Sequence, residues 1–223
     1  MTAEALTGAA RSLGHLALHY GKAEDGPIAA RLLGLLGFEE TQMLPLPGGN
    51  FYRFVVDPAH HSRGDGILFL SALPVPQLKL IETINQALNI GKEDEHEAVR
   101  DMRAMLLADP ESSFHLGFLV QSLEELEERI LSLRKLAESD TDFRGRITIS
   151  MNRAQPGDAA VDARLDASPL FGDVTRCAYG RNGVQVFVET DIFKGGQLGD
   201  AMVLEFDYVF PGNESHILSV VEL

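Results

Sequence analysis

The stretch FHLGFLV at residues 114–120 decides the fold, because the run GHLALHY at residues 14–20 resembles it one hundred residues earlier. Both runs are short and apolar, and each carries a histidine at its second position. In each run large apolar residues alternate with other residues, which is typical of a half-buried strand. A helical pattern follows both runs. The chain is therefore predicted to contain two copies of one structural unit.

Outward from residues 14–20, the sequence predicts one helix and three more strands. A turn at residues 25–27 precedes apolar residues at helical spacing, and Gly37 is placed to end that helix. Three strands are then predicted, at residues 39–46, 50–56 and 66–73. The first unit thus has the order strand, helix, strand, strand, strand.

The second copy follows the same order with an insertion. Ser122 and Glu125 have the spacing of a capping box and predict the start of a helix. Residues 153–173 contain many turn formers and are predicted to form a long loop. Asn182-Gly183 predicts a hairpin. Strands are expected at residues 145–152, 174–179, 184–190 and 202–210, with a terminal edge strand at 217–221.

The segment between the two copies has a different character. Its apolar residues recur at helical spacing on both sides of Gly91, which predicts two helices. The acidic run at residues 92–97 is interpreted as a solvated face. We therefore expect an α+β protein with an N-terminal unit at residues 1–75, a helical connector at 76–111 and a C-terminal unit at 112–223.

Composition limits the classes of partner. The net charge of −14 and the pI near 4.8 argue against nucleic acid and against anionic membrane surfaces. No apolar run approaches the length of a membrane span, and residues 1–12 lack the features of a signal peptide. Cys177 is the only cysteine, so an internal disulfide and a cysteine-based zinc site are excluded. A reducing, cytoplasmic location is the expectation.

A tandem pair of strand-helix-three-strand units, each opening with a His-Leu strand, resembles the vicinal oxygen chelate superfamily. That superfamily includes glyoxalases, extradiol dioxygenases, and resistance proteins that bind or modify antibiotics. The resemblance covers residues 14–210 and rests on the order of the motifs, with the connector as an insert. It implies two βαβββ units that form paired half-barrels around a metal or ligand cleft. It also implies a small substrate chelated through vicinal oxygens by a divalent metal ion such as Fe(II), and it is compatible with a homodimer.

The resemblance implies three metal ligands, His15, His115 and Glu205. A face test that is independent of the family agrees, because each of these residues alternates with large apolar neighbours. Two imidazoles and one carboxylate on one side of an ion leave adjacent positions open, the arrangement used for Fe(II) and dioxygen chemistry. The same cleft with a redox-inert ion would stabilise an enolate instead. A fourth, glyoxalase-type ligand is disfavoured, because the last strand of the first unit supplies only Ser71.

Several alternatives stay open at this stage. A strand histidine is more often a packed residue than a ligand, and His19 lies on the same face as His15. No proton-transfer residue can be aligned with the family, although the pair at residues 60–61 offers two histidines. Phe69 and Phe187 are candidate apolar walls of a cleft, and Glu189 either lines that cleft or faces water. The competing hypotheses are a metal-free protein of the same fold that binds a small ligand or dimerises, and a connector that binds a partner protein.

Overall fold

The computed structural model describes residues 13–59, 64–178, 182–195 and 200–212. The chain divides into two units, Met1–Ala72 and Leu73–Leu223. Helices and strands are both present in each unit, so the α+β class is as expected. The connector helices belong to the second unit. Among the described residues, no helix combines the length and the hydropathy that a membrane crossing requires.

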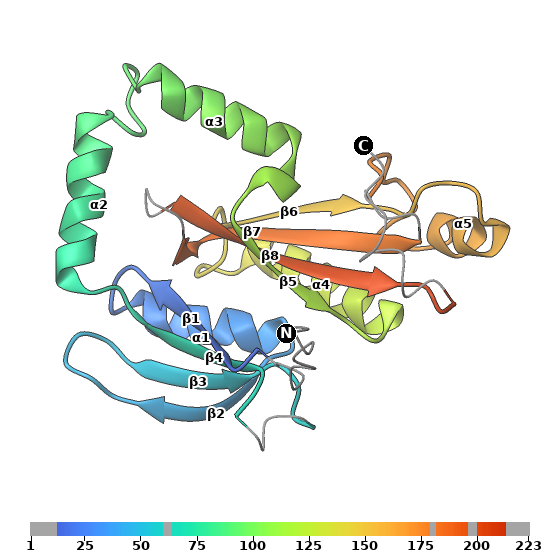
Figure 1. Cartoon of the computed structure of the whole chain (residues 1–223), viewed down its shortest axis with the longest axis horizontal. Helices are drawn as coiled ribbons and strands as arrows, with labels where there is room; N and C mark the ends of the chain where they lie inside the picture. Colours follow the sequence, from blue (N-terminus) through green and yellow to red (C-terminus); the bar gives the residue numbers. More distant parts are fainter. Residues whose placement is uncertain (1–12, 60–63, 179–181, 196–199, 213–223) are drawn as a thin grey trace, which may run out of the picture. The chain divides into compact units, whose positions relative to one another are not determined.

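The described residues of the first unit form one helix and four strands. Its elements are β1 (His15–Tyr20), α1 (Asp25–Leu35), β2 (Glu39–Leu44), β3 (Phe51–Val55) and β4 (Ile67–Ala72). The strands pair in the order β2-β3-β4-β1 (Figure 1). β1 runs parallel to β4, whereas the other two pairs are antiparallel. A parallel first and last strand need a crossover, and α1 supplies the helical part of it.

Tyr20 fixes α1 against one face of this sheet. Its ring is fully buried, and its hydroxyl donates to the Asn50 carbonyl oxygen at 2.6 Å. A Cβ atom added at Gly26 in α1 would lie 2.8 Å from the Tyr20 ring, and one added at Gly49 would lie 2.5 Å from its hydroxyl oxygen. The two glycines therefore make the close approach possible. His15 and Ala17 are exposed on the opposite face of β1.

In the second unit, the residues that the structure describes form four α-helices and four strands. Its elements are α2 (Val75–Ala87), α3 (Glu97–Ala108), a 3-10 turn (Pro110–Ser112), β5 (His115–Leu119), α4 (Leu123–Ser139), β6 (Ile147–Asn152), α5 (Ala159–Asp166), β7 (Gly183–Gly195) and β8 (Asp200–Val209). β7 pairs antiparallel with both β6 and β8, and β5 runs parallel to β8. The strand order is β6-β7-β8-β5.

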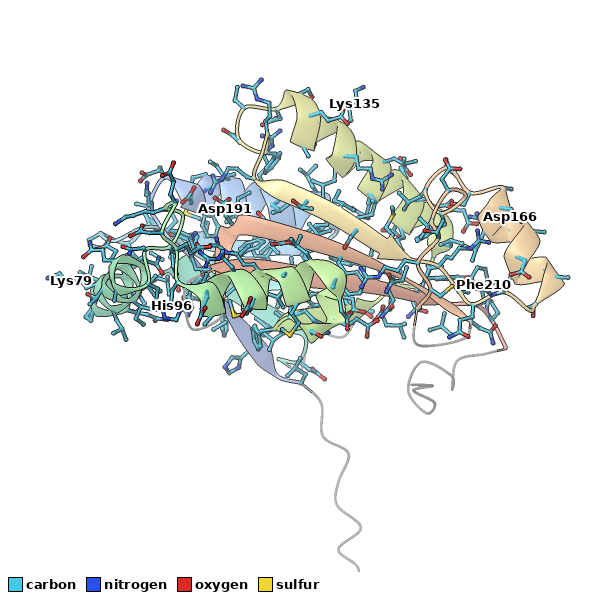
Figure 2. All side chains as sticks on the ribbon, turned by 90° about the horizontal axis from the view of Figure 1, so that it is seen from above. Lys79, His96, Lys135, Asp166, Asp191 and Phe210 are labelled. Atoms are coloured by element: carbon cyan, nitrogen blue, oxygen red, sulfur yellow. The ribbon has the colours of Figure 1, made fainter. Side chains whose placement is uncertain are left out.

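The two faces of this sheet have different covers. α4 begins at Ser122, whose hydroxyl oxygen accepts from the Glu125 backbone N–H at 3.1 Å, as the capping-box spacing predicts. It packs an apolar stripe on the sheet, and the residues of that stripe are Leu123, Leu126, Ile130 and Leu133. Figure 2 shows α4, marked by Lys135, on the side of the sheet opposite α3, which follows the labelled His96.

The connector helices bury little apolar surface. α2 has no buried residue, and in α3 only Val99 is buried. Arg176 ties the far end of α3 to the rest of the unit, since its Nη2 donates to the Ala108 carbonyl oxygen at 2.8 Å and lies 3.4 Å from Asp109 Oδ1. Cations suit a helix C-terminus, where the last carbonyls lack partners within the helix.

The expectation for residues 153–178 was wrong in two respects. Residues 159–166 form α5 rather than loop, because Asp158 accepts from the backbone N–H groups of Ala160 and Val161 and starts the helix. Residues 174–178 form no strand, and Cys177 makes only an isolated bridge with Arg153. The predicted hairpin partner is thus missing, and β7 pairs with β6 and β8 instead. The predicted strand at 217–221 and the histidines at 60–61 lie outside the described residues.

Candidate functional site

Three strands of the second unit bring the polar residues of the candidate site onto one face. Strand register places Gly117, Glu205 and Phe187 side by side across β5, β8 and β7. The neighbouring rows are His115 beside Val203, and Asp207 beside Gln185 and Asn152. Residues paired in register point to the same side of a sheet. This face is opposite the one that carries Leu204 and Phe206, as the alternation in β8 predicts.

His115 and Glu205 meet on this face. His115 Nε2 lies 2.9 Å from Glu205 Oε2, and the carboxylate is buried. The other ring nitrogen, Nδ1, lies 2.9 Å from the Ser113 carbonyl oxygen. A carbonyl can only accept, so Nδ1 carries a proton and Nε2 is the nitrogen directed at the carboxylate. This backbone contact fixes the orientation of the imidazole, which is the usual way a ligating histidine is held.

A chain of two amide side chains extends from the other oxygen of the Glu205 carboxylate. Gln185 Nε2 donates to Glu205 Oε1 at 2.7 Å, and Asn152 Nδ2 donates to Gln185 Oε1 at 3.0 Å. All three side chains are buried, with Asn152 only 2% exposed. Gln185 therefore occupies one carboxylate oxygen of Glu205 and leaves the other, Oε2, for His115. Sequence reasoning did not assign a role to Gln185 or Asn152.

Two further acids share this region and were also not identified from the sequence. Burial raises the pKa of the Asp207 carboxyl, and the neighbouring Glu205 charge raises it further. Burial also raises the pKa of the Glu111 carboxyl, and the Glu205 charge adds to the increase. A hydrogen bond with Gln185 acts in the opposite direction but does not cancel it. Asp207 Oδ1, Glu111 Oε1 and Asn152 Oδ1 are buried oxygens without a hydrogen-bond partner. Because burial and the neighbouring Glu205 charge disfavour the ionised forms of Asp207 and Glu111, the cluster does not readily hold three negative charges, and its unpaired acceptors outnumber the donors that His115 supplies.

The first unit offers an internal comparison, because its strands pair in the same pattern. β1 against β4 matches β5 against β8, so His15 beside Ile67 corresponds to His115 beside Val203. Two residues further along the last strand, Phe69 stands where the second unit has Glu205. The rings of His15 and Phe69 are 5.2 Å apart and tilted by 48°. His15 therefore has an aromatic neighbour in place of a carboxylate.

Of the three predicted ligands, the structure brings two together. His115 and Glu205 are in contact, whereas His15 belongs to the first unit, and its role as a third ligand stays a prediction. His19 Nδ1 lies 3.2 Å from Ser71 Oγ. Asp207 could have been found from the sequence, because alternation in β8 places it on the same face as Glu205.

The donors present fit a divalent cation. Two atoms that bind one ion at a right angle from about 2.1 Å lie roughly 3 Å apart, and the His115 and Glu205 atoms are separated by 2.9 Å. Imidazole and carboxylate are both common ligands of divalent metals. A nearby cation would lower the raised pKa values of Glu111 and Asp207 and so favour their ionised forms. Within the described part of the chain, no group of three or more His, Cys, Asp or Glu side chains is placed to hold a metal ion.

Comparisons with known proteins add three similar solved structures. A structure described as a possible glyoxalase from Bacillus cereus is 15% identical, with a TM-score of 0.33, and the alignment covers 88% of this chain and 98% of that one. A protein from Ralstonia eutropha JMP134, provisionally placed in the glyoxalase superfamily, is 12% identical, with a TM-score of 0.20 and coverage of 88% and 72%. A provisionally assigned hydrolase from Shewanella frigidimarina NCIMB 400 is 13% identical, with a TM-score of 0.23 and coverage of 93% and 83%.

No family model matches the sequence, and no curated protein matches it. Likeness to the three solved structures at this level carries no argument about activity. The functional proposal therefore rests on the side chains of the second unit.

Proposed function

We propose that His115 and Glu205 bind a divalent metal ion and that the protein is a metal-dependent enzyme acting on a small substrate with two adjacent oxygen atoms. The observation that carries the proposal is the 2.9 Å approach of His115 Nε2 to a buried carboxylate. His15 is the third ligand implied by the resemblance to the vicinal oxygen chelate superfamily. Fe(II) suits this ligand set, although other divalent ions use the same donors.

The residues around the pair have definable roles in this proposal. The Ser113 carbonyl oxygen orients His115, and Gln185 orients Glu205 by donating to the oxygen that faces away from the histidine. Gly117 has no side chain that could crowd Glu205 and Asp207. A Cβ atom added there would lie 3.9 Å from Glu205 Oε2. The fully buried Phe187 excludes water on the β7 side. Two substrate oxygens would chelate a metal ion held there, and the ion would polarise them.

Metal binding tests the proposal directly. The protein is purified without chelator, reconstituted anaerobically with Fe(II), Mn(II), Co(II) or Zn(II), and analysed for metal content and for affinity by calorimetry. We expect about one equivalent per chain for at least one ion, with the affinity reduced at least about 100-fold in His115→Ala and Glu205→Gln. Failure of the parent protein to bind any of the four ions would overturn the proposal.

Matched variants separate ligation from a general loss of charge. Glu189 is an exposed acid on the same face of the sheet, so Glu189→Gln should leave metal affinity unchanged. His19 lies on the same face of β1 as His15, so His19→Ala controls for His15→Ala. Loss of metal affinity in His15→Ala and not in His19→Ala would assign His15 as the third ligand. The reverse result would assign His19.

One observation favours a second candidate, a metal-free protein that binds a small ligand. Both ring nitrogens of His115 lie 2.9 Å from oxygen acceptors, so a doubly protonated imidazole would complete these contacts without a metal. In that case His115→Ala would leave metal content unchanged and would alter any ligand-induced rise in melting temperature.

A further inference from the structure

A cavity of about 110 Å³ lies in the second unit between the end of α3 and the sheet face that carries Glu205. Leu106 and Pro110 line it from the connector, and Phe187 and Val203 line it from β7 and β8. In Figure 2, α3 crosses this side of the sheet. The insert that distinguishes the chain from a plain pair of repeated units therefore forms one wall of a cavity.

The cavity borders the proposed metal ligands. Val203 pairs in register with His115, and Phe187 pairs with Glu205, so two wall residues are the direct strand neighbours of the two ligands. Ser113 connects the cavity with the ligand pair, because it is one of the lining residues and its carbonyl oxygen contacts the His115 ring. A molecule that bound an ion at the ligand pair could extend a group into this space without crossing another strand.

The lining favours a neutral hydrocarbon group. Its apolar walls are supplied by Leu106, Leu107, Pro110, Phe187, Ala201 and Val203. The rest of the lining is polar or charged, namely Ser113, Thr148, Ser150, Arg176 and Glu189. The Ser113 hydroxyl already donates to the Pro110 carbonyl oxygen at 2.6 Å. Arg176, at the same cavity, is engaged by the end of α3 and by Asp109. Burying a charged group against the apolar part of this lining would carry a desolvation cost.

We propose that this cavity binds a short apolar tail of the substrate, an unbranched alkyl group or a single small ring. This specificity proposal rests on the proposed metal site for the position of the chelating end. The volume is well below the roughly 300–1,000 Å³ of sites for drug-sized ligands. It corresponds to roughly four groups of the size of a water molecule. α3 sets the length of the tail, because Leu106 and Leu107 are the lining residues that it contributes.

A series of straight-chain hydroxamates, from acetohydroxamate to octanohydroxamate, tests the proposal on the metal-loaded protein. Each probe chelates a metal through two oxygens and differs only in its tail. We expect the affinity to rise by about fourfold per added methylene, the equivalent of about 0.8 kcal/mol, and to level off once the cavity is filled. A flat series on a protein that binds these probes would overturn the proposal.

Two variants change the length at which the affinity levels off. Ser150→Leu places a larger group in the lining and should shift the plateau to shorter tails. Leu106→Ala should shift it to longer ones. Leu131, an exposed residue of α4 on the other side of the sheet, provides Leu131→Ala as the control with an unchanged series. Circular dichroism and melting temperature confirm that each variant is folded.

A metal-free arm separates this inference from the proposed function. Butanol and hexanol are titrated into metal-free protein, and methyl NMR signals of Leu106 and Val203 are followed. Saturable shifts in the parent protein that disappear in Ser150→Leu would support the cavity even if no metal binds. If the methyl signals do not respond and metal-loaded protein shows no dependence on tail length, the cavity proposal fails while the metal site stands.

Discussion

His115 Nε2 and Glu205 Oε2 lie 2.9 Å apart on the second unit's sheet, at positions that His15 and Phe69 occupy in the first unit. The two histidines thus share a place in the strand pairing and differ in their partner. A carboxylate faces one imidazole, and an aromatic ring 5.2 Å away faces the other. The second unit alone therefore has an imidazole–carboxylate pair at this position of the repeat.

Metal binding should stabilise the protein against heat. A ligand at 100 times its Kd adds about 2.7 kcal/mol, and each kcal/mol raises Tm by about 2–4 °C in a chain of this size. We therefore expect differential scanning fluorimetry to show a rise of about 5–10 °C with the preferred ion. The rise should be absent in Glu205→Gln and retained in Glu189→Gln. An equal rise in Glu205→Gln would place the metal elsewhere.

Gln185→Leu should weaken the metal site without removing a ligand. The substitution removes the donor to Glu205 Oε1 and leaves that buried oxygen without its partner. Loss of such a supporting contact typically reduces metal affinity by about 10–100-fold. Asn152→Ala acts one step further away and should have a smaller effect on affinity, measured by calorimetry. Equal effects of both substitutions would show that the chain of amides acts as one unit.

Arg164 should be important for stability, because it pairs with a buried acid. Its Nη1 and Nη2 lie 3.0 and 2.8 Å from the two oxygens of Glu127, which is 7% exposed. Breaking a buried pair from one side costs about 3–5 kcal/mol, so Arg164→Met should lower the unfolding free energy by about that amount in urea denaturation.

A surface ion pair on α4, the helix that carries Glu127, provides the control. Arg129 and Glu125 form an exposed i,i+4 pair on α4, and exposed pairs contribute about 0–1 kcal/mol. Arg129→Met should therefore change the unfolding free energy far less than Arg164→Met. Comparable losses would mean that burial of Glu127 does not determine the cost.

The same buried pair should make stability depend on pH. Burial by itself would raise the pKa of the Glu127 carboxyl, but Arg164 and Ser168 outweigh it, and the pKa falls below its usual value of 4.5. A lowered folded-state pKa contributes stability that is present above the unfolded pKa and is lost as the pH falls through the folded value. The difference in unfolding free energy between the parent protein and Glu127→Gln should thus shrink below about pH 4.5. A difference that stays constant from pH 7 to pH 3 would contradict this assignment.

Asp158→Ala should destabilise α5 locally. Asp158 Oδ1 accepts from the backbone N–H groups of Ala160 and Val161, at 2.9 and 3.2 Å. Loss of an N-cap costs about 1 kcal/mol, which is large for a helix of eight residues. Hydrogen exchange should show faster exchange in residues 159–166, with protection of α4 unchanged. Asp158→Asn keeps a capping oxygen and should restore most of the protection.

The sequence by itself determined the alternation of strands and helices and the side of β8 on which Glu205 lies. These features follow from local periodicity, since a strand places successive side chains on opposite faces. The N-cap at Ser122 also depends only on neighbouring residues, and it starts α4 as predicted. The cap at Asp158 was present in the sequence too, but the surrounding turn formers concealed α5.

Only the tertiary structure decided which residues meet. Strand register places Glu205 beside Gly117 and Gln185 beside Asp207, and register depends on pairing between segments far apart in the chain. Burial then raises the pKa of the Asp207 carboxyl, an effect of surroundings that the sequence does not contain. The cavity under α3 has the same origin, because it exists only where a helix from the connector and strands near the C-terminus come together.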